Sequence, residues 1–176
     1  MAARSTKGEV RQFLGVMALA LLAIVAILSL QPGSVQLGAL ADIRLRAPDF
    51  EPLWRQSLLV QIHVLTVFYA LATGPVQFLL PKGTGFHRAL GWTWAGAMLV
   101  TAISSLFIRE INDGGFSPIH FFSVWTFVSL PLAVWLARRG DIRAHRGIMI
   151  GLYIGLIIAG VLAIAPGRVI WAMFFG

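Results

Sequence analysis

Five long apolar segments follow one another along the chain, each separated from the next by a more polar stretch. They cover approximately residues 12–30, 57–80, 87–108, 118–137 and 145–165. A helix rises about 1.5 Å per residue, so segments of this length can cross the roughly 30 Å hydrocarbon core of a bilayer. The pattern predicts an all-α integral membrane protein with five transmembrane helices, in keeping with a composition that is 58% hydrophobic.

The first apolar segment, residues 12–30, has one feature of a signal peptide, because basic residues precede it. Its apolar run is long for a signal peptide, however, and the Ala-x-Ala-like site at Ala39–Ala41 lies well beyond its end. We therefore expect an uncleaved transmembrane helix. Together with the loop that follows, it makes up residues 1–56. Residues 57–176 are expected to form a four-helix membrane bundle with a short C-terminal tail.

The two halves of this bundle, residues 57–108 and 118–165, share a pattern of histidine and proline positions. Each half has a histidine near the start of its first helix, a proline later in that helix, and a His-Arg pair at the start of its second helix. The matching positions are His63 and His120, Pro75 and Pro131, His87 and His145, and Arg88 and Arg146. The chain has no other histidine. A duplicated helix pair that runs twice in the same direction predicts a pseudo-twofold bundle with its axis along the membrane normal.

The repeat also predicts which histidines can share a ligand. In an up-down bundle of four sequential helices, His63 and His120 lie on diagonal helices at one end, and His87 and His145 on diagonal helices at the other. Neighbouring axes that lie 8–10 Å apart leave roughly 13 Å across the diagonal. That gap suits two imidazoles that approach opposite faces of a flat ligand such as haem b, so all four histidines are candidate iron ligands.

Arg88 and Arg146 follow the histidines of the second pair, and they are candidate partners of haem propionates through charge-assisted hydrogen bonds. Both arginines also suit a simpler role as positive anchors at the membrane surface. The histidines have alternatives too: interfacial anchoring, hydrogen bonds between helices, another metal, or a quinone pocket. From His63 to His87 is 24 residues, or roughly 36 Å of helix, which is long for direct electron transfer between two haems.

The sequence resembles two known families. The placement of histidines on the second and fourth helices for one haem, and on the third and fifth for another, is similar to two-haem cytochrome b-561. Here the histidines lie nearer the helix ends, and that family's basic substrate-binding motifs have no equivalent. The second resemblance is to the bacterial membrane proteins grouped as domain of unknown function 2306, and it implies no established activity. Its matching features are Ile62-His63, Gly74-Pro75, His87-Arg88 with Gly91, His145-Arg146, and the ending from Gly167 to Gly176.

The formal net charge of +7 is distributed unevenly about the expected spans. With a cytoplasmic N-terminus, nine basic and two acidic residues lie on the cytoplasmic side, and five of each lie on the other. This asymmetry follows the positive-inside rule and predicts a multi-pass protein of the bacterial inner membrane. The basic residues are spread over three short segments, which does not make a nucleic-acid patch. The expected partners are the lipid bilayer and a quinone or a respiratory redox protein.

Several activities are disfavoured by what the chain lacks. No charged residue lies in the middle of any expected span, whereas ion-coupled transporters usually keep one there. There is no His-Glu-x-x-His motif, and the absence of cysteine excludes disulfides and iron–sulfur clusters. We expect a b-type cytochrome-like protein that binds haem for membrane electron transfer. The alternative is a cofactor-free accessory or assembly subunit of a membrane complex, and whether the protein is an enzyme stays open.

The topology is tested with cysteines introduced one at a time, because the chain contains none of its own. Ser34 and Asn112 are expected on the outer side of the membrane and Gly140 on the cytoplasmic side. A membrane-impermeant thiol reagent applied to intact spheroplasts should label the first two positions and leave Gly140 unlabelled. Labelling at Gly140 would show an inverted orientation. Detection of an intact Met1 end by mass spectrometry would show that the first segment is not cleaved.

Overall fold

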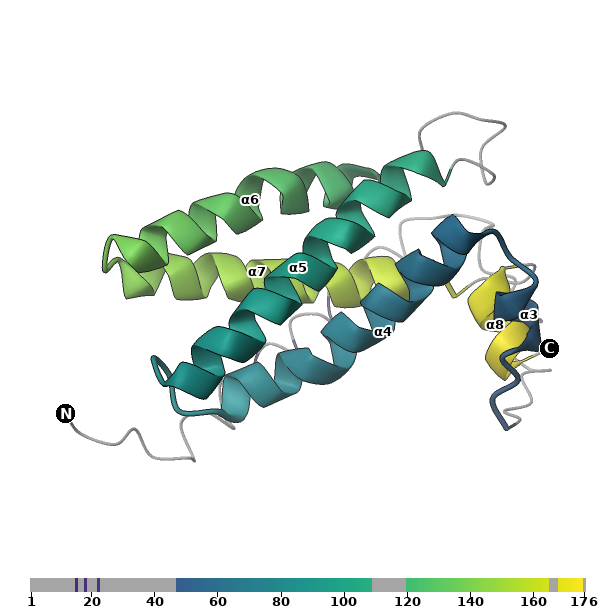
Figure 1. The fold of residues 1–176 in the computed structure, drawn as a ribbon, viewed down its shortest axis with the longest axis horizontal. Helices are drawn as coiled ribbons and strands as arrows, with labels where there is room; N and C mark the ends of the chain where they lie inside the picture. The colour runs from purple at the N-terminus through teal and green to yellow at the C-terminus, as the bar shows by residue number, and fades with distance from the viewer. Residues whose placement is uncertain are drawn as a thin grey trace.

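The computed structural model describes residues 47–108, 120–164 and 168–175, together with Gly15, Ala18 and Leu22. Within those residues all regular structure is helical. The helices run in the order α3 (Glu51–Trp54), α4 (Leu58–Leu79), α5 (Gly85–Phe107), α6 (His120–Arg138), α7 (Ile142–Leu162) and α8 (Val169–Phe174) (Figure 1). The expected span over residues 12–30 falls outside this part of the chain, apart from its three described residues.

Four helices, α4 to α7, are long and apolar enough to cross a membrane. They correspond to the second to fifth expected segments, which confirms a multi-pass helical membrane protein. The last span runs from Ile142 to Leu162, against an expected segment of approximately residues 145–165. The C-terminal tail contains a further helix, α8, which packs against α3.

Short polar side chains explain where three of the spans begin. Ser57, Thr84 and Asp141 each accept a hydrogen bond from the backbone N–H three residues further on, at 3.5, 3.1 and 3.0 Å. Such N-caps satisfy backbone donors that the first helical turn leaves unpaired. Gly140, just before the cap of α7, has φ +83°, which a cysteine tolerates poorly. Exposed Arg139 is therefore the better probe position in this turn.

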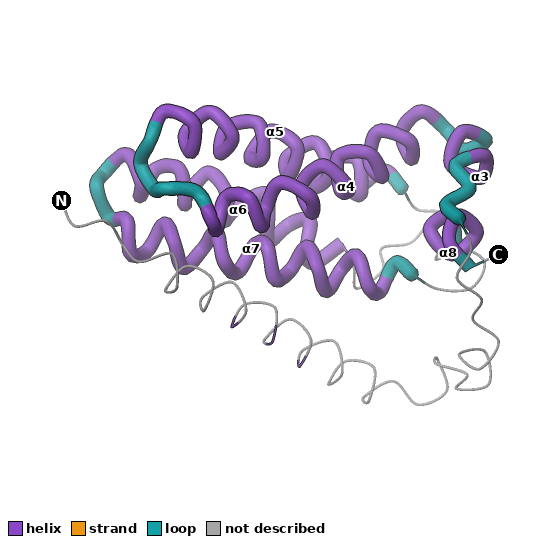
Figure 2. The backbone as a smooth tube through the Cα atoms, turned by 90° about the horizontal axis from the view of Figure 1, so that it is seen from below, coloured by secondary structure: helices purple, strands orange, loops and turns teal. Residues whose placement is uncertain are grey.

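The four spans form a ring. Helix α4 packs against α5 and α7, and α6 packs against the same two neighbours (Figures 1 and 2). Consequently α4 and α6 are diagonal, as are α5 and α7, which is the order that the up-down arrangement predicted. The origin of the two halves in a duplication stays a prediction.

The ring is closed where α4 and α7 cross beside a proline. Pro75 has no N–H, so the carbonyl of Leu71 lacks its helical donor. The hydroxyl of Tyr153, on α7, donates to that carbonyl at 3.2 Å. Gly74 lets the two helices approach so closely that a Cβ atom there would overlap the Tyr153 ring. The indole of Trp94, on α5, donates to the adjacent carbonyl of Ala70 at 3.0 Å, so the turn before Pro75 is bonded from two neighbouring helices.

Two short helices, α3 and α8, lie side by side at one end of the bundle (Figure 2). Leu53 of α3 and Met173 of α8 are completely buried between them and α4. The backbone N–H of Asp49 donates to the carbonyl of Met173 at 3.0 Å. The ring of Phe174 meets Phe68 of α4 edge to face at 6.4 Å. These contacts attach the C-terminal helix to the start of the first described span.

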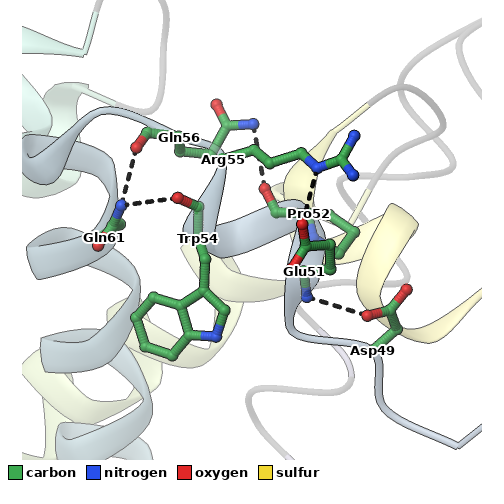
Figure 3. Close-up of polar contacts among 7 residues, drawn as sticks. All are labelled: Asp49, Glu51, Pro52, Trp54, Arg55, Gln56 and Gln61. Carbon is green, nitrogen blue, oxygen red and sulfur yellow. Dashed lines mark hydrogen bonds and ion pairs between the residues drawn. The ribbon is translucent and has the colours of Figure 1, made fainter.

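Polar contacts hold the corner between α3 and α4 (Figure 3). The amide of Gln61 donates to the carbonyls of Trp54 and Gln56 at 3.2 and 2.9 Å. On α3 itself, Arg55 forms an exposed ion pair with Glu51 at 3.1 Å. An exposed pair of this kind contributes little stability, so the buried apolar contacts and the Gln61 bonds are what fix the corner.

The close crossing of α4 and α7 predicts the effect of one added methyl group. Gly74→Ala should destabilise the protein by about 1–3 kcal/mol, because the new Cβ overpacks against the ring of Tyr153. Gly96→Ala is the matched control, since a Cβ at Gly96 meets nothing within 4 Å. Thermal unfolding in one detergent should show a lower midpoint for the first variant and no loss for the second. In a Tyr153→Leu background, which has already lost the hydrogen bond to the carbonyl of Leu71, Gly74→Ala should lower the midpoint much less than in the wild type, because the ring it overpacks is gone. Equal midpoints for Gly74→Ala and Gly96→Ala would contradict the close crossing.

Candidate functional site

A cavity of about 280 Å³ lies between the spans at the end of the bundle where α8 is found. All four spans contribute to its wall, and Ile170 contributes from α8. Most of the lining is apolar, with Val67 and Phe68 from α4 and Leu152 and Leu156 from α7 among the contributors. A concave, mostly apolar space with a few polar groups is the usual form of a small-molecule site.

The imidazole of His63 is part of the cavity wall. Its Nδ1 lies 3.1 Å from the carbonyl oxygen of Thr101 and 3.0 Å from Oγ of Ser104, both on α5. A carbonyl oxygen can only accept, so Nδ1 carries the proton. The Ser104 hydroxyl donates to the carbonyl of Val100 at 2.7 Å, which leaves its oxygen free to accept from the same N–H. In the neutral ring, Nε2 therefore carries the lone pair that is available to a ligand.

Hydroxyl groups add hydrogen-bonding capacity to the opposite wall. Ser123 and Thr126 of α6 line the cavity, and their residues are 6% and 7% exposed. Neither hydroxyl forms a hydrogen bond within the part of the chain that the structure describes. Ser105 of α5 also lines the space. A ligand in the cavity would meet an acceptor at His63 and donors at these side chains.

The α7 side of the wall includes four residues with little or no side chain among larger apolar ones. Gly155, Ala159, Gly160 and Ala163 all line the cavity. A Cβ atom at Gly155 would lie 3.4 Å from Cδ1 of Phe122 on the facing helix. The cavity therefore exists partly because these positions carry little or no side chain.

His120, the expected partner of His63, lies at the same end of the bundle on the diagonal helix. It is the first residue of α6 and is only 6% exposed. It is not among the residues that line the cavity, whereas Ser123, nearly one turn further along, is. The structure thus brings this histidine pair to one end but places only His63 at the cavity wall.

His87 and His145, the second expected pair, lie at the other end of the ring on α5 and α7. Nδ1 of His145 lies 2.9 Å from the carbonyl of Ala133 on α6, so it donates and leaves Nε2 with the lone pair. Nδ1 of His87 is buried and has no hydrogen-bond partner among the described residues. Arg88 is exposed and Arg146 half-buried, and neither forms an ion pair within the described ranges.

Gln77 joins this second group, although the sequence pattern did not single it out. Its amide nitrogen donates to the carbonyl of His87 at 3.1 Å, and its Oε1 is buried without a partner in the described residues. The signal for it was an amide side chain near the end of an otherwise apolar span. Across residues 47–108, 120–164 and 168–175, no group of three or more His, Asp or Glu side chains could hold a metal ion.

Taken together, the four apolar spans define a multi-pass helical membrane protein with a mostly apolar internal cavity. The chain belongs to the predicted membrane protein family DUF2306, whose family model matches residues 60–176. The match covers nearly all of α4 and everything that follows it, so it includes the cavity and all four histidines. No curated protein and no solved structure matches the chain.

Proposed function

We propose that this membrane protein binds a quinol dissolved in the bilayer, with the ring in the cavity beside His63. The observation that carries the proposal is the bonding of His63. Its Nδ1 proton is committed to the carbonyl of Thr101, which presents Nε2 as an acceptor inside the hydrocarbon region. A phenolic hydroxyl is the complementary donor. Intramembrane ionisable residues commonly mark sites of this kind.

The size and lining of the cavity suit one substituted ring. Its volume of about 280 Å³ lies just below the range of roughly 300–1,000 Å³ that encloses drug-sized ligands. Apolar walls favour a ring that partitions into the membrane, and the small residues Gly155 and Gly160 leave room for it. The hydroxyls of Ser123 and Thr126 can donate to a ring carbonyl, so the oxidised quinone form also finds partners.

Haem b is a second candidate, supported by a separate observation. His63 and His145 each donate Nδ1–H to a backbone carbonyl on a neighbouring helix, as histidines that ligate metals usually do. His63 with His120, and His87 with His145, would be the axial ligands, while Arg88 and Arg146 would bind propionates. Bound haem would supply one-electron transfer, as in the cytochrome b-561 layout.

The described cavity fits a quinol better than a haem. A haem held by His63 and His120 would need both histidines, but only His63 lines the cavity. No lysine or arginine lines the cavity to neutralise the propionates of a haem. The volume of the cavity is also small for a tetrapyrrole. For these reasons the quinol is the leading proposal. If neither the quinol nor haem binds, the protein is a cofactor-free accessory subunit.

The quinol proposal is tested with a radiolabelled decyl-benzoquinol and protein in nanodiscs, with binding to protein-free nanodiscs subtracted. His63→Phe should weaken binding roughly tenfold, because a hydrogen bond contributes about 1–1.5 kcal/mol. His145→Phe is the matched control: it removes an imidazole that is bonded to a carbonyl in the same way but lies far from the cavity. Equal effects of the two variants would place the ligand elsewhere. Ser123→Ala with Thr126→Val, which removes no bond between helices, should weaken binding of the oxidised quinone severalfold.

The haem candidate makes its own prediction. Protein purified from haem-replete cells should show the Soret and reduced α bands of low-spin haem. His63→Phe and His120→Phe should each abolish the same share of the spectrum, and the double variant should be little worse than either, because both ligands complete one site. A colourless protein that binds decyl-benzoquinol would exclude the haem and leave the quinol.

A further inference from the structure

We infer that the ligand enters the cavity sideways from the bilayer, between Trp125 of α6 and Ile164 at the end of α7, and that this opening holds a long apolar tail. The inference rests on the proposed quinol site and narrows its ligand to a tailed quinol, as opposed to a small ring without a tail. Three features of the described residues carry it: the covered end of the bundle, the exposed lining residues, and the lipid-facing side of α6.

The end of the bundle beside the cavity is covered by protein. Ile170 of α8 forms part of the cavity wall, and α8 is held in place by the fully buried Leu53 and Met173. A hydrogen bond from Asp49 to Met173 fastens the same helix to the chain before α3. A ligand arriving along the bundle axis would have to displace this apolar packing.

Two lining residues are exposed, while the others are buried or half-buried. Trp125 is 48% exposed and Ile164 is 40% exposed. Both side chains are apolar and both belong to spans or span ends. The cavity is therefore open where its wall meets the outer surface of the bundle.

That outer surface is the lipid-facing side of α6. Six of its exposed large apolar residues recur at helical spacing, as expected for a face that contacts hydrocarbon. The members of this stripe are Phe121, Val124, Trp125, Val128, Leu132 and Trp135. Trp125 belongs to the stripe and to the cavity wall at once, so it lies on the boundary between the lipid and the site.

A tailed quinol matches this arrangement along its whole length. Its ring hydroxyl reaches the Nε2 acceptor of His63, its ring lies among the apolar walls, and its tail passes Trp125 into the acyl chains. A ring without a tail would fill the inner part of the cavity and leave the opening to lipid. A longer tail should therefore increase the affinity through its contact with Trp125. This gain should not depend on the hydrogen bond at His63.

The test compares decyl-benzoquinol with its methyl analogue in nanodiscs, each corrected for binding to protein-free nanodiscs. The wild-type protein should bind the decyl compound at least about tenfold more tightly. Trp125→Ser should remove most of that advantage and leave the methyl compound unaffected. Phe121→Ser is the matched control, since Phe121 is 67% exposed in the same stripe and does not line the cavity; it should change neither affinity.

A photoreactive diazirine at the end of the decyl chain provides a second measurement. The diazirine should label peptides that contain Trp125 or Ile164. An excess of unlabelled decyl-benzoquinol should prevent this labelling. If both compounds bind equally and only His63→Phe weakens them, the tail site is wrong while the quinol site stands. If neither compound binds the wild-type protein, both proposals are wrong.

Discussion

Within a bilayer, a polar atom that has no hydrogen-bond partner finds no water to replace it, and each such atom costs several kcal/mol. Many of the contacts between the spans satisfy this requirement. Pro75 frees the carbonyl of Leu71, and Tyr153 supplies a donor from the neighbouring helix α7. Thr101 accepts from His63, and Ala133 accepts from His145. The helices are joined by small numbers of polar bonds set within apolar surfaces, and these bonds decide which faces meet.

Histidines at matching positions of the repeat differ in their hydrogen-bond partners. His63 is bonded to the helix that follows it, whereas His145 is bonded to the helix that precedes it. In the repeat, His63 corresponds to His120 and His145 to His87, so the two bonds to backbone carbonyls occur at non-equivalent positions of the repeat.

Much of the fold followed from the sequence, because hydropathy over some twenty residues reports directly on membrane spans. The four described spans were predicted closely, and the alternation of directions determined that α4 and α6 would be diagonal. The cavity was not predictable in this way. It depends on which side chains are small, such as Gly155, and on where Phe122 and Ser123 lie across from it. The role of Gly74 could not be predicted either. The sequence indicated a kink at Pro75, but it did not indicate that the ring of Tyr153 would pack against Gly74.

The bond between Tyr153 and Leu71 joins residues that are 82 positions apart. Helices α4 and α5 can pair as soon as both are inserted, and so can α6 and α7, because each pair is joined by a short turn. The ring closes only when the last span meets the first of the four. The cavity is therefore complete only after α7 has packed against α4, and a chain truncated before α7 would lack that wall.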